Sequence, residues 1–327
     1  MPQQNYFQKK TIKGEVAILG GAGLIGSRVA IKLVALNYRV KILSRSSRNK
    51  KALAIPGISH HQINNFSEQS ILYAIQGVDI VINTIGILHE NRKYKQEFED
   101  IHIKLVNNLC HAITQTNVKQ FIHLSALKAH SAHAPSRYLK SKGIAEDLVK
   151  KICSNKVAYS IVQPSLVFSE DAQSIKMFSK MVQFMPFVIP LARAHSKFAP
   201  IHVDDLAQLI IQIINNPKAS GRILQAYGPE VMTLKEIIKS IATAYHRRPL
   251  VLPLPYYLGW LQAFFLNYLI PGKLMTIDNF HSLSVKSVGE QSALNEFEII
   301  PTSFSKWSAS SLNKKIDLIS NYRNVTK

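Results

Sequence analysis

The feature that most constrains how this chain can fold is a run of glycines that directly follows a short apolar segment near the N-terminus. Residues 15–20 predict a buried strand, and the apolar spacing of residues 24–36 predicts an amphipathic helix. The junction of this strand and helix contains overlapping G-x-G-x-x-G and G-x-x-G-x-x-G patterns. The residues of these patterns are Gly20, Gly21, Ala22, Gly23, Leu24, Ile25 and Gly26. A strand, a tight glycine turn and a helix N-terminus place backbone N–H groups where they can bind the pyrophosphate of a dinucleotide. We therefore predict a dinucleotide site at these seven residues.

The first half of the chain continues by alternating strands with helices. Further strands are predicted at residues 39–44, 58–63, 79–84, 120–125 and 158–162, and further helices at 67–76, 98–116 and 137–152. This alternation predicts an α/β protein with a doubly wound parallel sheet, the Rossmann architecture, and a smaller C-terminal α/β subdomain. The expected organisation is a tail at 1–14, an NAD(P)-binding core at 15–165, an interleaved substrate or partner subdomain at 166–305 and a tail at 306–327.

The composition narrows the classes of partner. The 40 Lys and Arg against 20 Asp and Glu give a net charge of +20, which attracts phosphate, anionic lipid or an acidic protein. Because the positive charge is spread along the chain and no nucleic-acid-binding motif is present, we expect no nucleic acid partner. The 2 cysteines and 12 histidines show no metal-ligand spacing, so we expect no metal site and a reducing compartment. Residues 1–14 lack the apolar stretch of a secretory signal, so the expected location is the cytoplasm.

The end of the second predicted strand bears on the choice of cofactor. An NAD-specific site places Asp or Glu there to hydrogen-bond the ribose 2′-hydroxyl. This chain has no acidic residue between Glu15 and Glu68, and it carries Arg45 and Arg48 instead. A guanidinium can pair with a 2′-phosphate and stack on adenine. We therefore expect NADP(H) in preference to NAD(H), the alternative being that both arginines only contribute to the basic surface.

A tyrosine and a lysine follow the fifth predicted strand. Tyr138 and Lys142 are four residues apart on a predicted helix, which places both side chains on one face. An ammonium group can lower the pKa of the tyrosine and hold the nicotinamide ribose, and the tyrosine can then exchange a proton with a carbonyl or hydroxyl as hydride moves. We predict that they form a catalytic pair; the alternative is a solvated helix face.

Several motifs together resemble the short-chain dehydrogenase/reductase superfamily, in its extended or atypical branch. They are the glycine loop, residues 83–86, the Tyr138 and Lys142 pair, residues 163–168 and residues 201–207. Closer still, Ser-Arg-Tyr-Leu-x-x-Lys, the aromatic segment 256–270 and Gly228-Pro229 are similar to the Rossmann accessory subunit of respiratory complex I and its bacterial relatives. The resemblance covers roughly residues 15–305.

The resemblance implies roles for further residues. Thr84, Ile85 and Gly86 would line the nicotinamide side, and Pro164 and Val167 would flank the nicotinamide. Tyr138 and Lys142 would be the catalytic pair or its relic.

The chain departs from the family's pattern in three ways, one of which is Leu19 where the family usually has Thr before the first glycine. Asn65 stands where the family often has an acid that meets adenine. The third catalytic residue would be Ser125, with Ser131 and Ser136 as alternatives. These departures leave cofactor binding intact and weaken the case for turnover.

The most apolar segment lies in the C-terminal half. Residues 256–270 predict one helix rich in Trp, Tyr and Phe, which is shorter than the ~20 residues that span a bilayer. It is either a packed helix of the C-terminal subdomain or an interfacial element that contacts anionic membrane.

Three functions follow from these features. The first is an NAD(P)H-binding accessory or assembly protein linked to respiratory complex I or quinone metabolism, peripheral on the inner face of the cytoplasmic membrane. The second is an NADP(H)-dependent oxidoreductase or epimerase of a small carbonyl or nucleotide-sugar substrate, using Tyr138 and Lys142. The third is a cofactor-sensing regulator. The sequence favours the first and leaves enzymatic activity open.

Overall fold

A seven-stranded parallel sheet forms the centre of the computed structural model, which describes residues 11–45, 55–63, 65–91, 97–268 and 275–312. Its strands are β1 (Gly14–Leu19), β2 (Tyr38–Ser44), β3 (Ile58–Gln62), β4 (Ile80–Asn83), β5 (Gln120–Leu124), β6 (Ala158–Pro164) and β11 (Arg222–Ala226). The order across the sheet is β11-β6-β5-β4-β1-β2-β3, and each neighbouring pair is parallel. The chain order reverses beside β1, where doubly wound sheets bind their ligands. The predicted fold class is confirmed.

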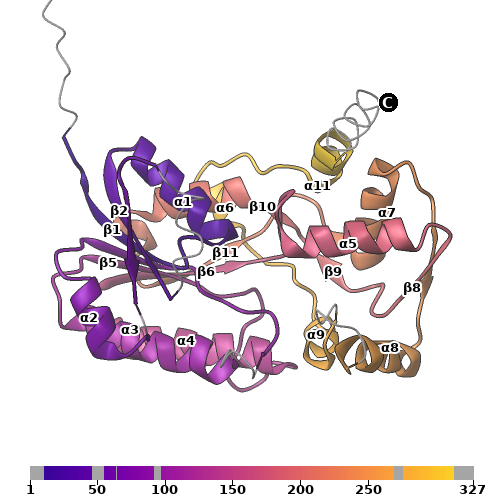
Figure 1. Ribbon diagram of the computed structural model, residues 1–327, viewed down its shortest axis with the longest axis horizontal. Helices are drawn as coiled ribbons and strands as arrows, with labels where there is room; N and C mark the ends of the chain where they lie inside the picture. The colour runs from indigo at the N-terminus through magenta and orange to yellow at the C-terminus, as the bar shows by residue number, and fades with distance from the viewer. Residues whose placement is uncertain (1–10, 46–54, 64, 92–96, 269–274, 313–327) are drawn as a thin grey trace, which may run out of the picture.

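Helices cover both faces of this sheet (Figure 1). One face carries α1 (Leu24–Ala35) and α6 (Val203–Ile213), and the other carries α2 (Glu68–Ala74), α3 (Leu105–Thr114) and α4 (Arg137–Cys153). Every residue of β4 and β5 is buried, as expected for central strands of a parallel sheet. This two-sided burial explains the apolar run Ile80–Ile82 of β4, whereas β5 also buries the polar side chains of Gln120 and His123.

The C-terminal unit is mostly helical, with short two-stranded ribbons. Its helices are α5 (Gln173–Phe184), α7 (Leu234–Ala244), α8 (Tyr256–Tyr268), α9 (Ile277–Ser282) and α11 (Phe304–Trp307), whereas α10 (Ala293–Glu296) packs on α6 and β11 of the sheet unit. Its ribbons pair β7 (Val167–Phe168) with β10 (Ile201–His202), β8 (Val188–Leu191) with β13 (Leu250–Pro253), and β9 (Lys197–Phe198) with β12 (Met232–Thr233). The chain interleaves the two units, because α6 and β11 follow the first part of the C-terminal unit and return to the central sheet.

Two elements differ from their predicted extent for physical reasons. The helix predicted over residues 98–116 begins with a π-helical turn, Glu99–Lys104, and becomes α-helical only at Leu105. The buried ring of His102 lies in this wider turn and stacks on Phe98 at 5.3 Å between ring centroids. Strand β6 continues to Pro164, beyond its predicted end, because it pairs with β11 in a register that joins Ala226 to Pro164.

Candidate functional site

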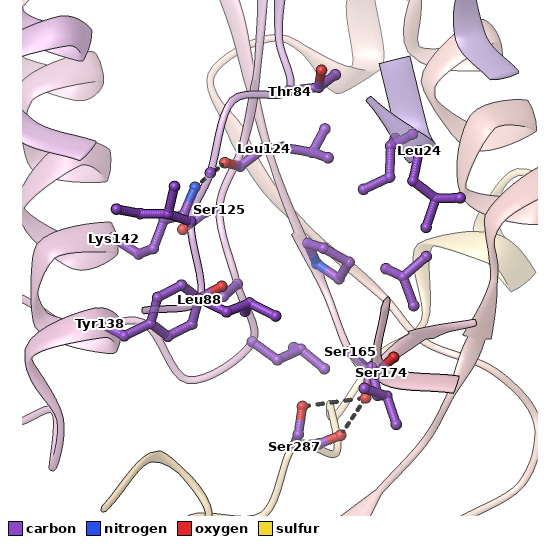
Figure 2. Close-up of a pocket in the computed structure, with 18 of the residues that line it drawn as sticks. Leu24, Thr84, Leu88, Leu124, Ser125, Tyr138, Lys142, Ser165, Ser174 and Ser287 are labelled. Atoms are coloured by element: carbon purple, nitrogen blue, oxygen red, sulfur yellow. Dashed lines mark hydrogen bonds between the residues drawn. The ribbon is translucent and has the colours of Figure 1, made fainter. Parts of the chain in front are cut away.

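A cavity of about 460 Å³ opens at the carboxyl edge of the sheet, between the sheet unit and the C-terminal unit. Thirteen of the predicted site residues line it: Gly20, Gly23, Leu24, Ile25, Gly26, Thr84, Ile85, Gly86, Ser125, Tyr138, Lys142, Pro164 and Val167. Figure 2 shows Tyr138, Lys142 and Ser125 on one wall and Ser165, Ser174 and Ser287 across from them. The structure therefore brings residues from four strand ends into one pocket.

Two positions in the glycine loop, Gly20 and Gly26, require glycine. Gly20 has a φ of +78°, the left-handed region that favours glycine, and it turns the chain from β1 toward α1. A Cβ at Gly26 would lie 2.5 Å from the carbonyl oxygen of Gly20 and 2.6 Å from Cα of Gly21, so the helix packs directly on the turn. Helix α1 begins at Leu24 with Gly23 as its N-cap, and its first-turn amides face the pocket that Leu24, Ile25 and Gly26 line. This geometry is suited to an anionic diphosphate.

The Tyr138 and Lys142 side chains both line the pocket, but their electrostatics differ from the prediction. The Lys142 ammonium donates hydrogen bonds to the carbonyl oxygens of Leu124 at 3.0 Å and Ile85 at 3.5 Å. Burial lowers the pKa of Lys142 to about 8, with Glu146 acting in the opposite direction. Burial, together with the charge of Asp278, raises the pKa of Tyr138 to about 12. The expectation that the lysine lowers the tyrosine pKa is wrong here, because burial and an acidic neighbour dominate.

Of the three serines considered, Ser125 lines the pocket. Its hydroxyl oxygen is buried and has no hydrogen-bond partner within the described chain; the Glu146 carboxyl lies close by without reaching hydrogen-bond geometry. Ser136 is instead the N-cap of α4, accepting a hydrogen bond from the Leu139 amide at 3.2 Å. Ser131 lies in a turn before that helix and does not line this cavity. A buried hydroxyl without a hydrogen-bond partner lowers the stability of the fold unless a ligand forms a hydrogen bond with it.

The other predicted cofactor residues that the structure describes lie outside the cavity lining. Gly21 packs on β2, where an added Cβ would lie 2.8 Å from Ile42, and Ala22 follows it in the turn. Arg45 directly follows β2 and places its guanidinium 5.6 Å from the ring centroid of Phe66. The side-chain oxygen of Asn65 accepts hydrogen bonds from the Ser67 amide and the Ser70 hydroxyl, so it organises the start of α2. Arg48 falls outside the described residues.

A comparison with protein families assigns the chain. The model of the NAD dependent epimerase/dehydratase family matches residues 16–226, which hold the sheet, the glycine loop and the Tyr138 and Lys142 pair. The chain belongs to this family. Members of the epimerase/dehydratase family are named for their dependence on NAD, which agrees with a pyridine nucleotide in the pocket.

Individual relatives carry a respiratory name. The "NADH dehydrogenase (ubiquinone) 1 alpha subcomplex subunit 9, mitochondrial" of Dictyostelium discoideum is 35% identical over 173 residues, which is 53% of this chain and 46% of the relative. The protein of the same name from Mus musculus is 27% identical over 303 residues, 90% of this chain and 75% of the relative. The chain thus spans about half of the first relative and three quarters of the second.

Solved structures share the epimerase/dehydratase fold. An NADPH-dependent quinone oxidoreductase from Escherichia coli matches with a TM-score of 0.72 at 16% identity, over 90% of this chain and 98% of that one. The UDP-glucuronic acid 4-epimerase of Bacillus cereus matches with a TM-score of 0.69 at 15% identity, over 93% and 99%. The TM-scores establish a common fold.

The family site includes contacts that sequence analysis missed. The Asp278 carboxylate of α9 accepts hydrogen bonds from the backbone amides of Arg137 at 2.7 Å and Tyr138 at 3.1 Å. It thereby caps α4 at the turn that carries the tyrosine. The Arg137 guanidinium pairs with both carboxylate oxygens of Glu90, at 2.8 and 3.1 Å. Because Asp278 and Glu90 are distant in sequence from Arg137, no local pattern signals these contacts.

A buried hydrogen-bond chain supports the same turn. His102 Nε2 accepts from the Ile87 amide at 3.1 Å, so its proton lies on Nδ1 and is donated to the Ser141 hydroxyl at 2.8 Å. Ser141 in turn donates to the backbone carbonyl of Tyr138 at 2.8 Å. Burial, aided by the charge of Lys142, lowers the pKa of His102 to about 2, so the ring is neutral. Within the described ranges, no group of three His, Cys, Asp or Glu side chains is placed to hold a metal ion.

Proposed function

We propose that this protein is an NAD(P)H-binding accessory or assembly protein of respiratory complex I, or of quinone metabolism. The observation that carries the proposal is the pocket itself, a glycine loop and a Tyr-x-x-x-Lys pair on a chain whose relatives are named as NADH dehydrogenase subunits. In this pocket Lys142 is held by backbone carbonyls and Tyr138 keeps its proton, an arrangement suited to gripping a ribose.

Three measurements test this proposal. Mass spectrometry of the nucleotide released from the purified protein should find a pyridine nucleotide. A tagged chain expressed in its own host should co-purify with subunits of the respiratory NADH dehydrogenase, and its deletion should lower the amount of assembled complex. A protein that neither retains nor binds a pyridine nucleotide, or unchanged complex in the deletion strain, would contradict the proposal.

The preference for NADP(H) rests on Arg45. Replacing it by alanine removes the cation that would meet a 2′-phosphate, so the affinity for NADPH should fall by about 10–100-fold while that for NADH changes little. The matched control is Arg39→Ala, since Arg39 is exposed near the opposite end of the same strand. Titration calorimetry with both nucleotides measures the effect. Equal losses for NADPH and NADH would remove Arg45 as the source of a preference.

An NADP(H)-dependent oxidoreductase is the second candidate, favoured by the partnerless hydroxyl of Ser125 beside Tyr138. In that case Tyr138→Phe should abolish substrate-dependent NADPH oxidation and leave the NADPH dissociation constant within about twofold, because it removes only the proton donor. Single-turnover absorbance at the NADPH band, followed over a panel of quinones, ketones and sugars, makes the measurement. Oxidation that survives in Tyr138→Phe would exclude this role for the tyrosine.

A peripheral location on the inner face of the cytoplasmic membrane is proposed from α8 and its neighbours. The inner side of α8 packs through Gly259 and Ala263 on Ala192 and Phe280. Its outer side leaves Tyr257 82% exposed, with Leu258, Leu261, Phe264 and Phe265 also exposed. Among the described helices none is long and apolar enough to cross a bilayer. The helix therefore suits an interfacial position, with its aromatic side chains at the headgroup level.

The neighbouring elements extend this apolar surface and make its surroundings basic. Phe184 and Phe187, at the end of α5 and after it, are 84% and 83% exposed, and Leu250 of β13 is also exposed. Gln262 ties α8 to β8 by hydrogen bonds to the backbone of Ala192 and Pro190. Segments 172–203 and 237–277, which supply these elements, contain no Asp or Glu. An anionic lipid surface complements such a face.

Removing two exposed aromatic side chains should weaken lipid binding. We expect the wild type to float with vesicles that contain anionic lipid, and Tyr257→Ser with Phe265→Ser to bind them at least about tenfold more weakly, since apolar area no longer enters the interface. Tyr73→Ser is the control, because Tyr73 is 81% exposed on α2 of the other unit. A wild type that stays unbound at low salt would contradict the membrane proposal.

A further inference from the structure

We infer that the half of the cavity beyond the nicotinamide end binds a neutral, largely apolar compound with a carbonyl group, such as a quinone or a ketone, and not a nucleotide sugar. The inference rests on the proposed function, because it places the pyridine nucleotide in the glycine-loop half. It separates the small-carbonyl alternative from the nucleotide-sugar alternative for the same site.

Apolar side chains from distant parts of the chain form the far half. They follow β4, β5 and β6, lie in β9, and follow α9: Leu88, Leu127, Leu166, Phe198, Leu283 and Val285. The last three belong to the C-terminal unit, so the wall facing the sheet unit is itself apolar. Such a surface gains free energy by covering a ring or an aliphatic chain.

The lining offers almost no charge. Among the described residues that form it, Lys142 is the only one with a side chain that is charged at neutral pH, and its ammonium is engaged with the carbonyls of Leu124 and Ile85. A nucleotide sugar carries its own negatively charged diphosphate in addition to that of the cofactor. Burying these charges without a facing cation costs several kcal/mol. The far half is therefore poorly matched to such a substrate.

The first turn of α5 is the other feature of this half that could attract an anion. Ala172, Gln173 and Ser174 line the cavity at the helix N-terminus. A helix end provides only about half a positive charge, and Asp171 pairs with Lys176 at 3.1 Å at this same end. Asp171 lies outside the cavity lining, so the half charge of the helix end is all that this turn offers to a diphosphate. The backbone N–H groups of this turn can still donate a hydrogen bond to an oxygen atom of a neutral ligand.

The hydrogen-bonding groups that remain are suited to one carbonyl. The hydroxyl of Ser125 has no partner within the described chain and shares a wall with Tyr138 (Figure 2). Across the cavity, Ser165 donates to the carbonyl of Ser287 at 2.8 Å and is satisfied without a ligand. The cavity of about 460 Å³ must also hold the nicotinamide end, which leaves space for a ring-sized ligand and not for a second nucleotide.

Binding to the full chain saturated with NADP⁺ tests the inference without turnover. The probes are menadione as a quinone, 2-nonanone as a ketone, and UDP-glucose and UDP-glucuronic acid as nucleotide sugars. We expect menadione or the ketone to bind at least about tenfold more tightly than either nucleotide sugar. A nucleotide sugar that binds as tightly as the better of the two carbonyl probes would overturn the inference.

Variants that place a charged side chain in the far half of the cavity test where the carbonyl probe binds. Leu88 is 52% exposed, so Leu88→Asp should fold, and it should weaken the carbonyl probe at least about tenfold with NADP⁺ affinity retained. Leu36→Asp, at an exposed leucine after α1, is the control and should change neither affinity. Leu283→Asp is the second variant, from the facing wall. Carbonyl binding unchanged in both pocket variants would refute the site. If neither NADP⁺ nor NAD⁺ binds, the proposed function fails; if the nucleotide binds and the carbonyl probes do not, only this inference fails.

Discussion

Gly26→Ala should abolish measurable binding of NADPH and NADH, with a loss of at least about 100-fold in affinity. The new Cβ would lie 2.5 Å from the Gly20 carbonyl oxygen and 2.6 Å from the Gly21 Cα, and both are backbone atoms that cannot move alone. The turn and the first helical turn must separate, which disperses the amides that face the diphosphate. We also expect the free energy of unfolding to fall by about 1–3 kcal/mol, the usual cost of overpacking. Calorimetric titration and chemical denaturation measure the two effects.

Gly221→Ala provides a control with a comparable loss of stability. Gly221 has a φ of +74° and open space around its Cα, so alanine there costs backbone strain of about 1 kcal/mol far from the pocket. This variant should bind nucleotide as the wild type does. If Gly26→Ala retains affinity, the diphosphate does not lie on the glycine turn.

Lys142→Met should stabilise the nucleotide-free protein while removing most of its affinity for nucleotide. Burial lowers the pKa of Lys142 from 10.5 to about 8, so holding the ammonium charged near neutral pH costs the folded state about 3 kcal/mol. Methionine removes this cost but leaves the carbonyl of Leu124 without its side-chain donor, so the expected net gain is about 1–3 kcal/mol. Loss of the ammonium should weaken NADPH binding by about 10–100-fold, since a charged donor to the ribose is lost.

The pH dependence separates this account from a simple packing effect. The pKa of Lys142 is lower in the folded than in the unfolded protein, so between about pH 8 and 10 the unfolded chain binds more protons. Burial of the charged ammonium therefore lowers the free energy of unfolding of the wild type below about pH 8. This loss is regained as the pH rises and the ammonium loses its proton. The advantage of Lys142→Met should shrink over that interval in denaturation experiments. An advantage that is independent of pH, or a variant less stable than the wild type at pH 7, would be inconsistent with a buried ammonium.

Local patterns were sufficient for the elements that position the nucleotide. The glycine turn depends on a strand, a turn and a helix that are contiguous in sequence, so the spacing from Gly20 to Gly26 determined it. The four-residue spacing of Tyr138 and Lys142 likewise placed both side chains in the pocket, because helix geometry is local.

The electrostatics and the far wall could not be predicted in this way. The pKa of Tyr138 depends on burial and on Asp278, which lies 140 residues away and reaches the helix only through α9. The apolar wall comes from β9 and from the segment after α9, whose sequences show no period that signals a pocket. Such contacts are set by tertiary packing and leave no local signature.

Titration calorimetry of the folded wild type with NADPH and with NADH is the most direct measure of the central claim. The account predicts one saturable site per chain for a pyridine nucleotide, tighter for NADPH, with binding lost in Gly26→Ala and retained in Gly221→Ala. Flat titrations with both nucleotides, on protein shown to be folded by its thermal transition and free of bound nucleotide by mass spectrometry, would contradict it.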